Sequence, residues 1–211
     1  MTNTDNIELD SDILVEKDVV EGVGLLTLNR PQKRNAISPE MYRQFNDVMR
    51  DHQINPNVNA IMIVSNGEVF CAGGDLNMIS HAKSGDIDAN ELDLDFFTPG
   101  VVTKPIICGV NGACVGEGVA MMLASDLVIC DQSSRFRLPE IGFGIPPVDI
   151  PLLGARKVNP IFMLDLLLTG EWKDANWAEK VGLVNEIVSD EELRGATFRL
   201  AKKIASAPRE I

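Results

Sequence analysis

The segment from Lys104 to Asp126, KPIICGVNGACVGEGVAMMLASD, places the tightest constraint on the fold. It opens with a short apolar run after a proline, which is typical of a strand buried on both faces. Asn111-Gly112 ends that run, and Gly116 and Gly118 then leave bare backbone just before an apolar run of helical type. The segment therefore predicts a strand, a glycine-rich turn and a helix, in that order.

The predicted turn is a candidate site for negative charge. At such a junction the first backbone N–H groups of the helix have no partner within the helix and point outward at the positive end of its dipole. An anion, or an oxygen that is becoming one, fits there. The alternative interpretation of this segment is that its glycines only allow tight packing. The spacing of Gly112, Gly116 and Gly118 gives neither GxGxxG nor a P-loop, which argues against both nucleotide-binding motifs.

Composition narrows the class of protein. The chain has 211 residues, enough for one sizeable domain with its own core. Acidic residues outnumber basic ones by 31 to 19, which argues against a nucleic-acid groove or a membrane-surface patch as the main function.

The four cysteines lack CxxC spacing and lie in apolar segments, so we expect buried free thiols in a reducing compartment. No apolar run approaches the ~20 residues of a membrane span, and the acidic start is unlike a signal peptide, so a cytoplasmic protein is expected.

The chain divides into a tail and one core domain. Residues 1–12 are polar and acidic and predict a mobile tail, and residues 13–211 form the predicted core. Short apolar segments on either side of Glu21-Gly22 predict a hairpin, and Ser38-Pro39-Glu40 predicts the start of a helix that runs to about His52. The alternation of strands and helices along the chain indicates an α/β fold with largely parallel pairing.

The two histidines give no indication of a metal site. We expect His52 to lie at a helix end and His81 in a polar loop, both in contact with solvent. Neither has a neighbouring pattern of cysteines or carboxylates, so no metal is predicted.

Seven short motifs occur in one order along the chain. They are Asn29-Arg30-Pro31 with Asn35-Ala36, Phe70 to Leu76 (FCAGGDL), Lys104-Pro105 with Val110-Asn111-Gly112, Ser125-Asp126-Leu127, Phe136 with Pro139-Glu140, Leu168-Thr169-Gly170, and Gly182-Leu183-Val184-Asn185. In this order and spacing the chain resembles the crotonase, or enoyl-CoA hydratase/isomerase, superfamily over nearly its whole length.

This resemblance implies a fold, a ligand and an assembly. The implied fold is an α/β, crotonase-like spiral of repeated ββα units with flanking helices. The implied ligand is an acyl-CoA thioester, with coenzyme A carried as part of the substrate and no separate cofactor. Family members usually form homotrimers or hexamers. They also continue past Ser206-Ala207-Pro208 with another pair of helices, so we expect the C-terminal helical cover to be missing or shortened here.

The resemblance also assigns binding roles. Family members hold the thioester carbonyl between two backbone N–H groups, which by position correspond to those of Gly74 and Glu117. The backbone that would line the pantetheine and adenine path belongs to Ala36, Ala72, Asp75 and Leu76. Lys33 and Arg34 are candidates for the phosphates, with ordinary solvated loop charges as the alternative.

The sequence departs from the hydratase pattern at one catalytic position. Hydratases of the family use two carboxylates, and the second corresponds to Glu140 whereas the first is replaced by Ala120. Two carboxylates suit the placement and deprotonation of a water, while a single acid/base suits moving one proton between carbons of a substrate. The sequence therefore favours isomerisation, or another enolate reaction, over hydration.

Three carboxyl groups are candidates for catalysis. Glu140 is the leading acid/base, because a carboxyl in a tight apolar loop tends to have a raised pKa. The Glu117 side chain is a weaker candidate, since an acid in the first turn also complements the helix dipole. Asp149 lies one residue away from the position of a catalytic aspartate in dienoyl-CoA isomerases of the family, and capping of the next helix is its alternative role.

Three other functions stay open. A non-catalytic acyl-CoA-binding or assembly subunit is compatible with Ala120 and the short C-terminus, and a true enoyl-CoA hydratase is the second alternative. RNA binding, reported for some members of the fold, is disfavoured by the acidic balance.

Overall fold

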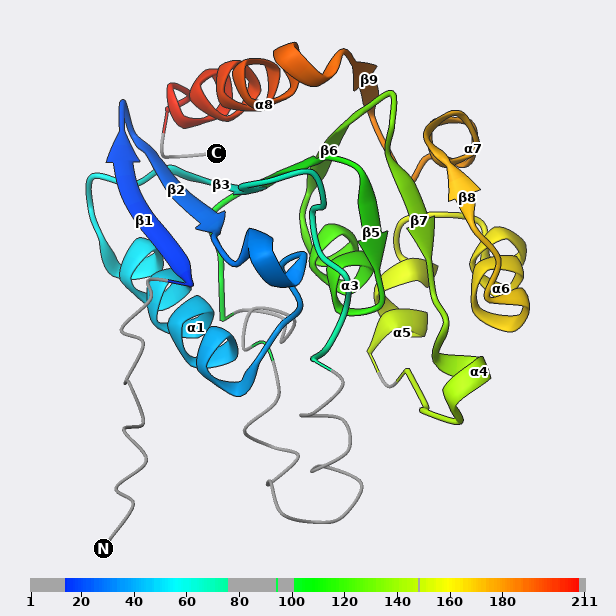
Figure 1. Ribbon diagram of the computed structural model, residues 1–211. Coiled ribbons are helices and arrows are strands. Elements are labelled where there is room, and N and C mark those ends of the chain that lie inside the picture. The colour runs from blue at the N-terminus through cyan, green and yellow to red at the C-terminus, as the bar shows by residue number, and fades with distance from the viewer. Residues whose placement is uncertain (1–13, 76–93, 95–100, 148, 209–211) are drawn as a thin grey trace, which may run out of the picture.

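A six-stranded sheet forms the centre of the protein (Figure 1). The computed structural model describes residues 14–75, 94, 101–147 and 149–208. Within this part the sheet has the order β1 (Val15–Val20), β2 (Val23–Leu28), β3 (Ala60–Ser65), β4 (Ile106–Val110), β6 (Leu127–Asp131) and β9 (Glu186–Val188). β1 and β2 pair antiparallel, and every later pair is parallel. The predicted α/β class with largely parallel strands is therefore confirmed.

Helices cover both faces of this sheet. In Figure 1, α8 (Asp190–Ala205) lies over one face, while α1 (Pro39–Ile54) and α3 (Glu117–Ala124) lie on the other. Successive side chains of β3 alternate between these layers, because a strand has a two-residue repeat. Ala60, Met62 and Val64 pack in the cluster under α8, whereas Ile61 and Ile63 pack in the larger core with α1.

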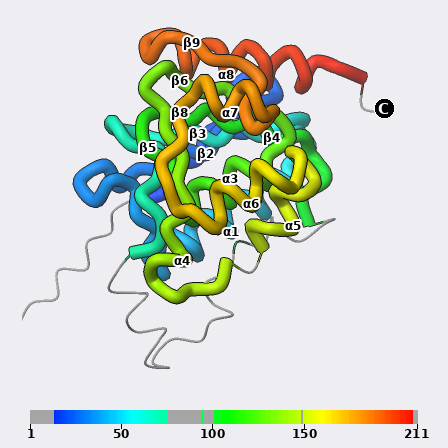
Figure 2. Tube along the Cα trace, turned by 90° about the vertical axis from the view of Figure 1, so that its right-hand side faces the viewer, coloured from blue at the N-terminus to red at the C-terminus, as the bar shows by residue number. Residues whose placement is uncertain are grey.

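A smaller second layer lies beside the main sheet. It is a three-stranded sheet of β5 (Ala113–Val115), β7 (Arg135–Arg137) and β8 (Lys173–Asp174). Figure 2 shows the short helices gathered beside it. These helices are α4 (Glu140–Phe143), α5 (Ile150–Ala155), α6 (Pro160–Thr169) and α7 (Ala175–Val181).

The structure confirms several elements that the sequence predicts. The hairpin turns at Glu21-Gly22, and α1 begins after Ser38, whose side chain accepts a hydrogen bond of 3.3 Å from the Met41 N–H. All four cysteines are buried and free. The predicted tail, residues 1–12, lies outside the described residues.

Two short elements are absent from the sequence-based description. β5 lies inside the segment predicted as a glycine-rich turn, and α4 begins at Glu140, for which the sequence predicts a tight apolar loop. β5 is stable because it pairs with β7, which comes about twenty residues later, and a three-residue strand has too few positions to show periodicity.

His52 is fully buried, so the expectation of a solvated histidine is wrong. Its Nε2 lies 3.0 Å from the carbonyl oxygen of Leu25. A carbonyl can only accept, so Nε2 carries the proton and Nδ1 is left as a bare acceptor. Nδ1 is buried and has no hydrogen-bond partner among the described residues. The ring packs against Gly24, where an added Cβ would lie only 2.7 Å from Nδ1.

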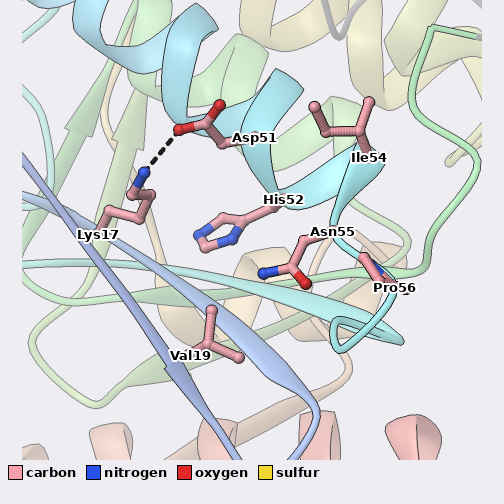
Figure 3. A pocket seen from close by; sticks show the side chains of 7 residues that line it. All are labelled: Lys17, Val19, Asp51, His52, Ile54, Asn55 and Pro56. Carbon is pink, nitrogen blue, oxygen red and sulfur yellow. Dashed lines mark hydrogen bonds and ion pairs between the residues drawn. The ribbon is translucent and has the colours of Figure 1, made fainter.

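Figure 3 shows the surroundings of this histidine at the end of α1. A surface pocket of about 390 Å³ is lined there by Lys17, Val19, Asp51, His52, Ile54, Asn55 and Pro56. The charged groups that face the ring are Lys17 on β1, Asp51 on α1 and Lys104, whose Nζ donates to the His52 carbonyl at 2.6 Å. Burial is the largest cause of a lowered His52 pKa, so the folded protein holds a neutral imidazole.

We expect this histidine to make the protein less stable in acid. The unfolded chain binds a proton at His52 below its ordinary pKa of 6.5, while the folded chain does so only at lower pH. Stability is therefore lost as pH falls below that value, by at most about 1.4 kcal/mol for each pH unit. Urea unfolding at pH 7.5 and 5.5 measures this loss.

The matched variant for this experiment is His52→Gln, whose side-chain amide can still donate to Leu25 but has no charge to gain. Its stability should change less than that of the wild type between the two pH values. Equal changes in both proteins would show that His52 does not cause the acid sensitivity.

Candidate active site

The turn between β5 and α3 has the backbone geometry that an outward-pointing N–H requires. Gly116 precedes α3 with φ 51° and ψ −112°, a conformation that only glycine adopts without strain. Its carbonyl oxygen accepts a hydrogen bond of 3.1 Å from the Ala120 N–H and so points along the helix. In a trans peptide the N–H points opposite to the C=O. The N–H of Glu117 therefore points out of the N-terminal end of α3, as the sequence predicts.

The Gly73-Gly74 segment presents a second N–H by the same rule. Ile37 N–H donates to the Gly73 carbonyl at 2.9 Å, and Asp75 N–H donates to the Ile37 carbonyl at 2.9 Å. The peptide that joins Gly73 to Gly74 thus turns its C=O toward Ile37. Its N–H, which belongs to Gly74, points to the opposite side.

The two glycine turns are in contact. The backbones of Cys71 and Cys114 in β5 pair as an isolated β-bridge, and Gly74 pairs in the same way with Ile37. The segment of residues 71–75 therefore runs between Ile37 on one side and β5 on the other. A Cβ placed on Gly116 would lie 3.6 Å from the Cα of Gly73. The structure therefore brings together the two backbone segments that carry the predicted donors, Gly74 and Glu117.

Glu140 reaches the same turn from the second layer. It is the first residue of α4, and its Oε1 lies 2.8 Å from the position that a Cβ on Gly116 would occupy. Its Oε2 is buried and has no hydrogen-bond partner in the described part of the chain. Burial raises the pKa of this carboxyl group above its ordinary value of 4.5. A carboxyl group that is partly desolvated and has one oxygen without a partner is suited to proton transfer.

The other two predicted carboxyl groups have different surroundings. The charge of Glu117 acts on the buried Cys71 thiol, whose pKa is raised to about 12 mainly by burial and further by this charge. The Glu117 side chain is thus near Cys71. Asp149 precedes α5 and makes no side-chain capping hydrogen bond, so the capping alternative finds no support. Asp149 therefore immediately precedes a helix, α5, that packs against α3, the helix of the predicted donor turn.

The residues predicted to line the substrate path lie on neighbouring segments. Lys33 and Arg34 are exposed at the end of the short helix η1 (Pro31–Lys33), and the Ala72 N–H donates to the Arg34 carbonyl at 3.0 Å. Ala36 and Asp75 are joined through one guanidinium nitrogen of Arg30, a contact that sequence reasoning missed. Leu76 lies outside the described residues. The roles of these residues in binding stay predictions.

The described residues contain no group of three or more His, Cys, Asp or Glu side chains that could hold a metal ion. None of their helices is long and apolar enough to cross a membrane.

Comparisons with known proteins give the family. Residues 18–211 match the profile of the enoyl-CoA hydratase/isomerase family. A protein named "Probable enoyl-CoA hydratase, mitochondrial" from Dictyostelium discoideum is 34% identical over 87% of this chain and 67% of its own length. The 1,2-epoxyphenylacetyl-CoA isomerase of Escherichia coli is 30% identical over 90% of this chain and 75% of its own length.

A solved structure agrees with this assignment. The crystal structure of an enoyl-CoA hydratase from Mycobacterium smegmatis is similar with a TM-score of 0.80 and 30% identity, and the match covers 93% of this chain and 83% of that one. The similar proteins carry the names of different reactions, so similarity alone does not choose among them. The chain belongs to the enoyl-CoA hydratase/isomerase family and has the crotonase fold.

Proposed function

We propose that this protein catalyses enolate chemistry on an acyl-CoA thioester, and that it isomerises a double bond in preference to adding water. The observation that carries the proposal is the position of Glu140, a half-buried residue whose Oε2 is buried and whose pKa is raised, at the glycine turn before α3. Coenzyme A would enter as part of the substrate and would need no separate cofactor.

The two backbone N–H groups would receive the thioester oxygen. The directions of the Gly74 and Glu117 N–H groups follow from the hydrogen bonds of the preceding carbonyls to Ile37 and Ala120. Donors that are already in place stabilise an oxyanion strongly, because no reorganisation is needed when charge develops. Removal of one such donor typically raises the barrier by ~3 kcal/mol.

Glu140 would move the proton. As a carboxylate it takes a proton from the carbon next to the thioester of a 3-enoyl chain, and the electron pair moves into the enolate oxygen. The resulting acid returns the proton to the fourth carbon, so the double bond shifts to the 2-position with no net change in atoms. A raised pKa suits both steps, since the group must accept and then release a proton.

The helix after the turn supplies the argument against hydration. Ala120 lies one helical turn after Gly116 and is 2% exposed. By the resemblance, it takes the position at which hydratases of the family carry their first carboxylate, and a methyl group can neither accept nor release a proton. A water would then have only Glu140 to orient and deprotonate it, besides any help from Glu117 or Asp149. A single carboxyl group serves a proton shuttle better than it serves the addition of water.

A panel of CoA thioesters tests the proposed reaction. We expect the wild-type protein to convert 3-enoyl-CoA to 2-enoyl-CoA and to hydrate crotonyl-CoA at a much lower rate, with both products resolved by liquid chromatography. Hydration as fast as isomerisation would favour the true hydratase instead. Binding of the thioesters without any conversion would favour a non-catalytic acyl-CoA-binding subunit.

Assembly into a homotrimer or hexamer stays a prediction. Large apolar side chains are exposed on neighbouring helices of the second layer, and such patches commonly mark protein interfaces. The most exposed of them are Ile141, Phe143, Leu152, Ile161, Leu164 and Leu168. Contact with a second copy of the chain would remove this surface from water. A cytoplasmic location likewise stays a prediction.

A further inference from the structure

One arginine ties together the two backbone segments beside the proposed donor Gly74. The Nη1 of Arg30 donates to the Ala36 carbonyl at 2.9 Å and to Oδ2 of Asp75 at 2.8 Å. The side chains of Arg30 and Asp75 are only 18% and 20% exposed, so this ion pair is less screened by solvent than a surface pair. Ala36 immediately precedes Ile37, and Asp75 immediately follows Gly74.

The segment that Arg30 holds has little stiffness of its own. Gly73 and Gly74 lack side chains, and Gly73 has φ +93°, so this pair has more backbone freedom than any other residues would have. The orientation of the peptide between Gly73 and Gly74 is set by two hydrogen bonds, from the Ile37 N–H to the Gly73 carbonyl and from the Asp75 N–H to the Ile37 carbonyl. Arg30 bridges the two segments beside these bonds. Loss of the bridge would remove one of the contacts that hold the Gly74 peptide in place.

Arg30 is itself fixed by a buried side chain. The Arg30 N–H donates to Oδ1 of Asn35 at 2.8 Å, and the Asn35 N–H donates to the Arg30 carbonyl at 3.0 Å. Asn35 is fully buried, and its Nδ2 donates to the carbonyls of Asn66 and Val69. It holds φ +52°, a left-handed conformation that asparagine tolerates better than most residues. These hydrogen bonds therefore hold the backbone of Arg30 in a fixed position.

We infer that Arg30 is a positioning residue that acts through Asp75 to keep the Gly74 N–H aimed at the thioester oxygen. The inference rests on the proposed function and names a residue that acts without touching the substrate. A donor that is turned from its direction stabilises the transition state less, while the remaining contacts of the long CoA moiety are unchanged. The defect should therefore appear in kcat rather than in KM.

The test compares three variants with the wild type on the 3-enoyl-CoA substrate. Arg30→Met keeps the apolar stem but removes both hydrogen bonds, and we expect kcat to fall about 10- to 100-fold with KM within about threefold. Arg30→Lys should recover most of this loss, because both bonds come from one nitrogen and an ammonium group can donate to both acceptors. The control Arg43→Met removes an exposed pair with Glu40 on α1 and should leave kcat unchanged.

A second measurement does not depend on turnover. The amide protons of Ile37 and Asp75 form the bonds on either side of Gly74, so their hydrogen exchange reports directly on this segment. We expect faster exchange at both amides in Arg30→Met and in Asp75→Asn, but not in Arg43→Met. This readout also applies if Arg30→Met folds too poorly for kinetics, since Asp75→Asn retains the shape of the carboxyl group.

The two proposals fail in different ways. An active wild type together with an Arg30→Met variant of normal kcat, or of normal exchange at both amides, would overturn the positioning role. A lower kcat that Arg30→Lys does not restore would also count against it. A wild type that converts no thioester would overturn the proposed function, and the exchange experiment would still decide whether Arg30 holds the Gly74 segment.

Discussion

Glu140→Gln is expected to lower kcat for isomerisation by about 10²- to 10⁴-fold, the usual contribution of a general acid/base. The amide keeps the size of the side chain but can neither accept nor release the proton. Because glutamine has the same shape as glutamate beside Gly116, substrate binding should be retained. Steady-state kinetics on the enoyl-CoA panel, with binding measured separately by calorimetry, separates the two effects.

The pH dependence gives a second view of the same residue. Because the pKa of Glu140 is raised above 4.5, the wild-type kcat/KM should rise with pH through a midpoint above that value. This rise should be absent from the residual activity of Glu140→Gln. A variant with full turnover, or one with the wild-type pH profile, would show that another group moves the proton.

Stability should move in the opposite direction to activity. The folded protein keeps the Glu140 proton at pH values where the unfolded chain has already released it, so stability is lost as pH rises through that window. At pH 7 the neutral amide should therefore leave the protein at least as stable as the wild type. Glu171→Gln, on an exposed side chain, is the matched control and should change neither property.

Gly116→Ala is expected to cost both activity and stability. A Cβ at this position would lie 2.8 Å from Oε1 of Glu140, and φ 51° with ψ −112° is strained for any residue with a side chain. The strain should cost ~1–3 kcal/mol of stability. A displaced carboxyl group and a rotated Glu117 peptide should together lower kcat by about 10²-fold or more.

Gly195→Ala provides the control for this substitution. Gly195 lies within α8, and an added Cβ would meet only the end of the flexible Arg199 side chain, at 3.2 Å. We expect unchanged kcat and a gain of up to ~1 kcal/mol in urea unfolding, because alanine is the better helix former. If Gly116→Ala folds and turns over substrate like Gly195→Ala, the turn before α3 is not part of the active site.

Much of the main sheet and its helices could be predicted because their signals are local. β4 is buried along its whole length, as its unbroken apolar run indicates, and α1 begins after Ser38 with a proline in its first turn. The glycine turn at Gly116 was also predictable, since glycines between an apolar strand and an apolar helix are a short-range pattern. The motifs around Gly74 and Glu140 were recognisable only by resemblance to a family.

The sequence by itself determined the α/β class and the strand-turn-helix unit around Gly116, because both depend on residue type and on neighbours along the chain. The resemblance to a family added that Ala120 stands where hydratases carry a carboxylate. Only the tertiary structure decided that Oε2 of Glu140 is buried without a partner among the described residues, that Arg30 joins Asp75, and that His52 is buried against Gly24 of β2. These properties arise from contacts between segments distant in the chain. Burial and hydrogen bonding then set the pKa of each titratable side chain and the direction of each N–H donor. The spacing of residues along the sequence shows neither the burial nor the hydrogen bonding.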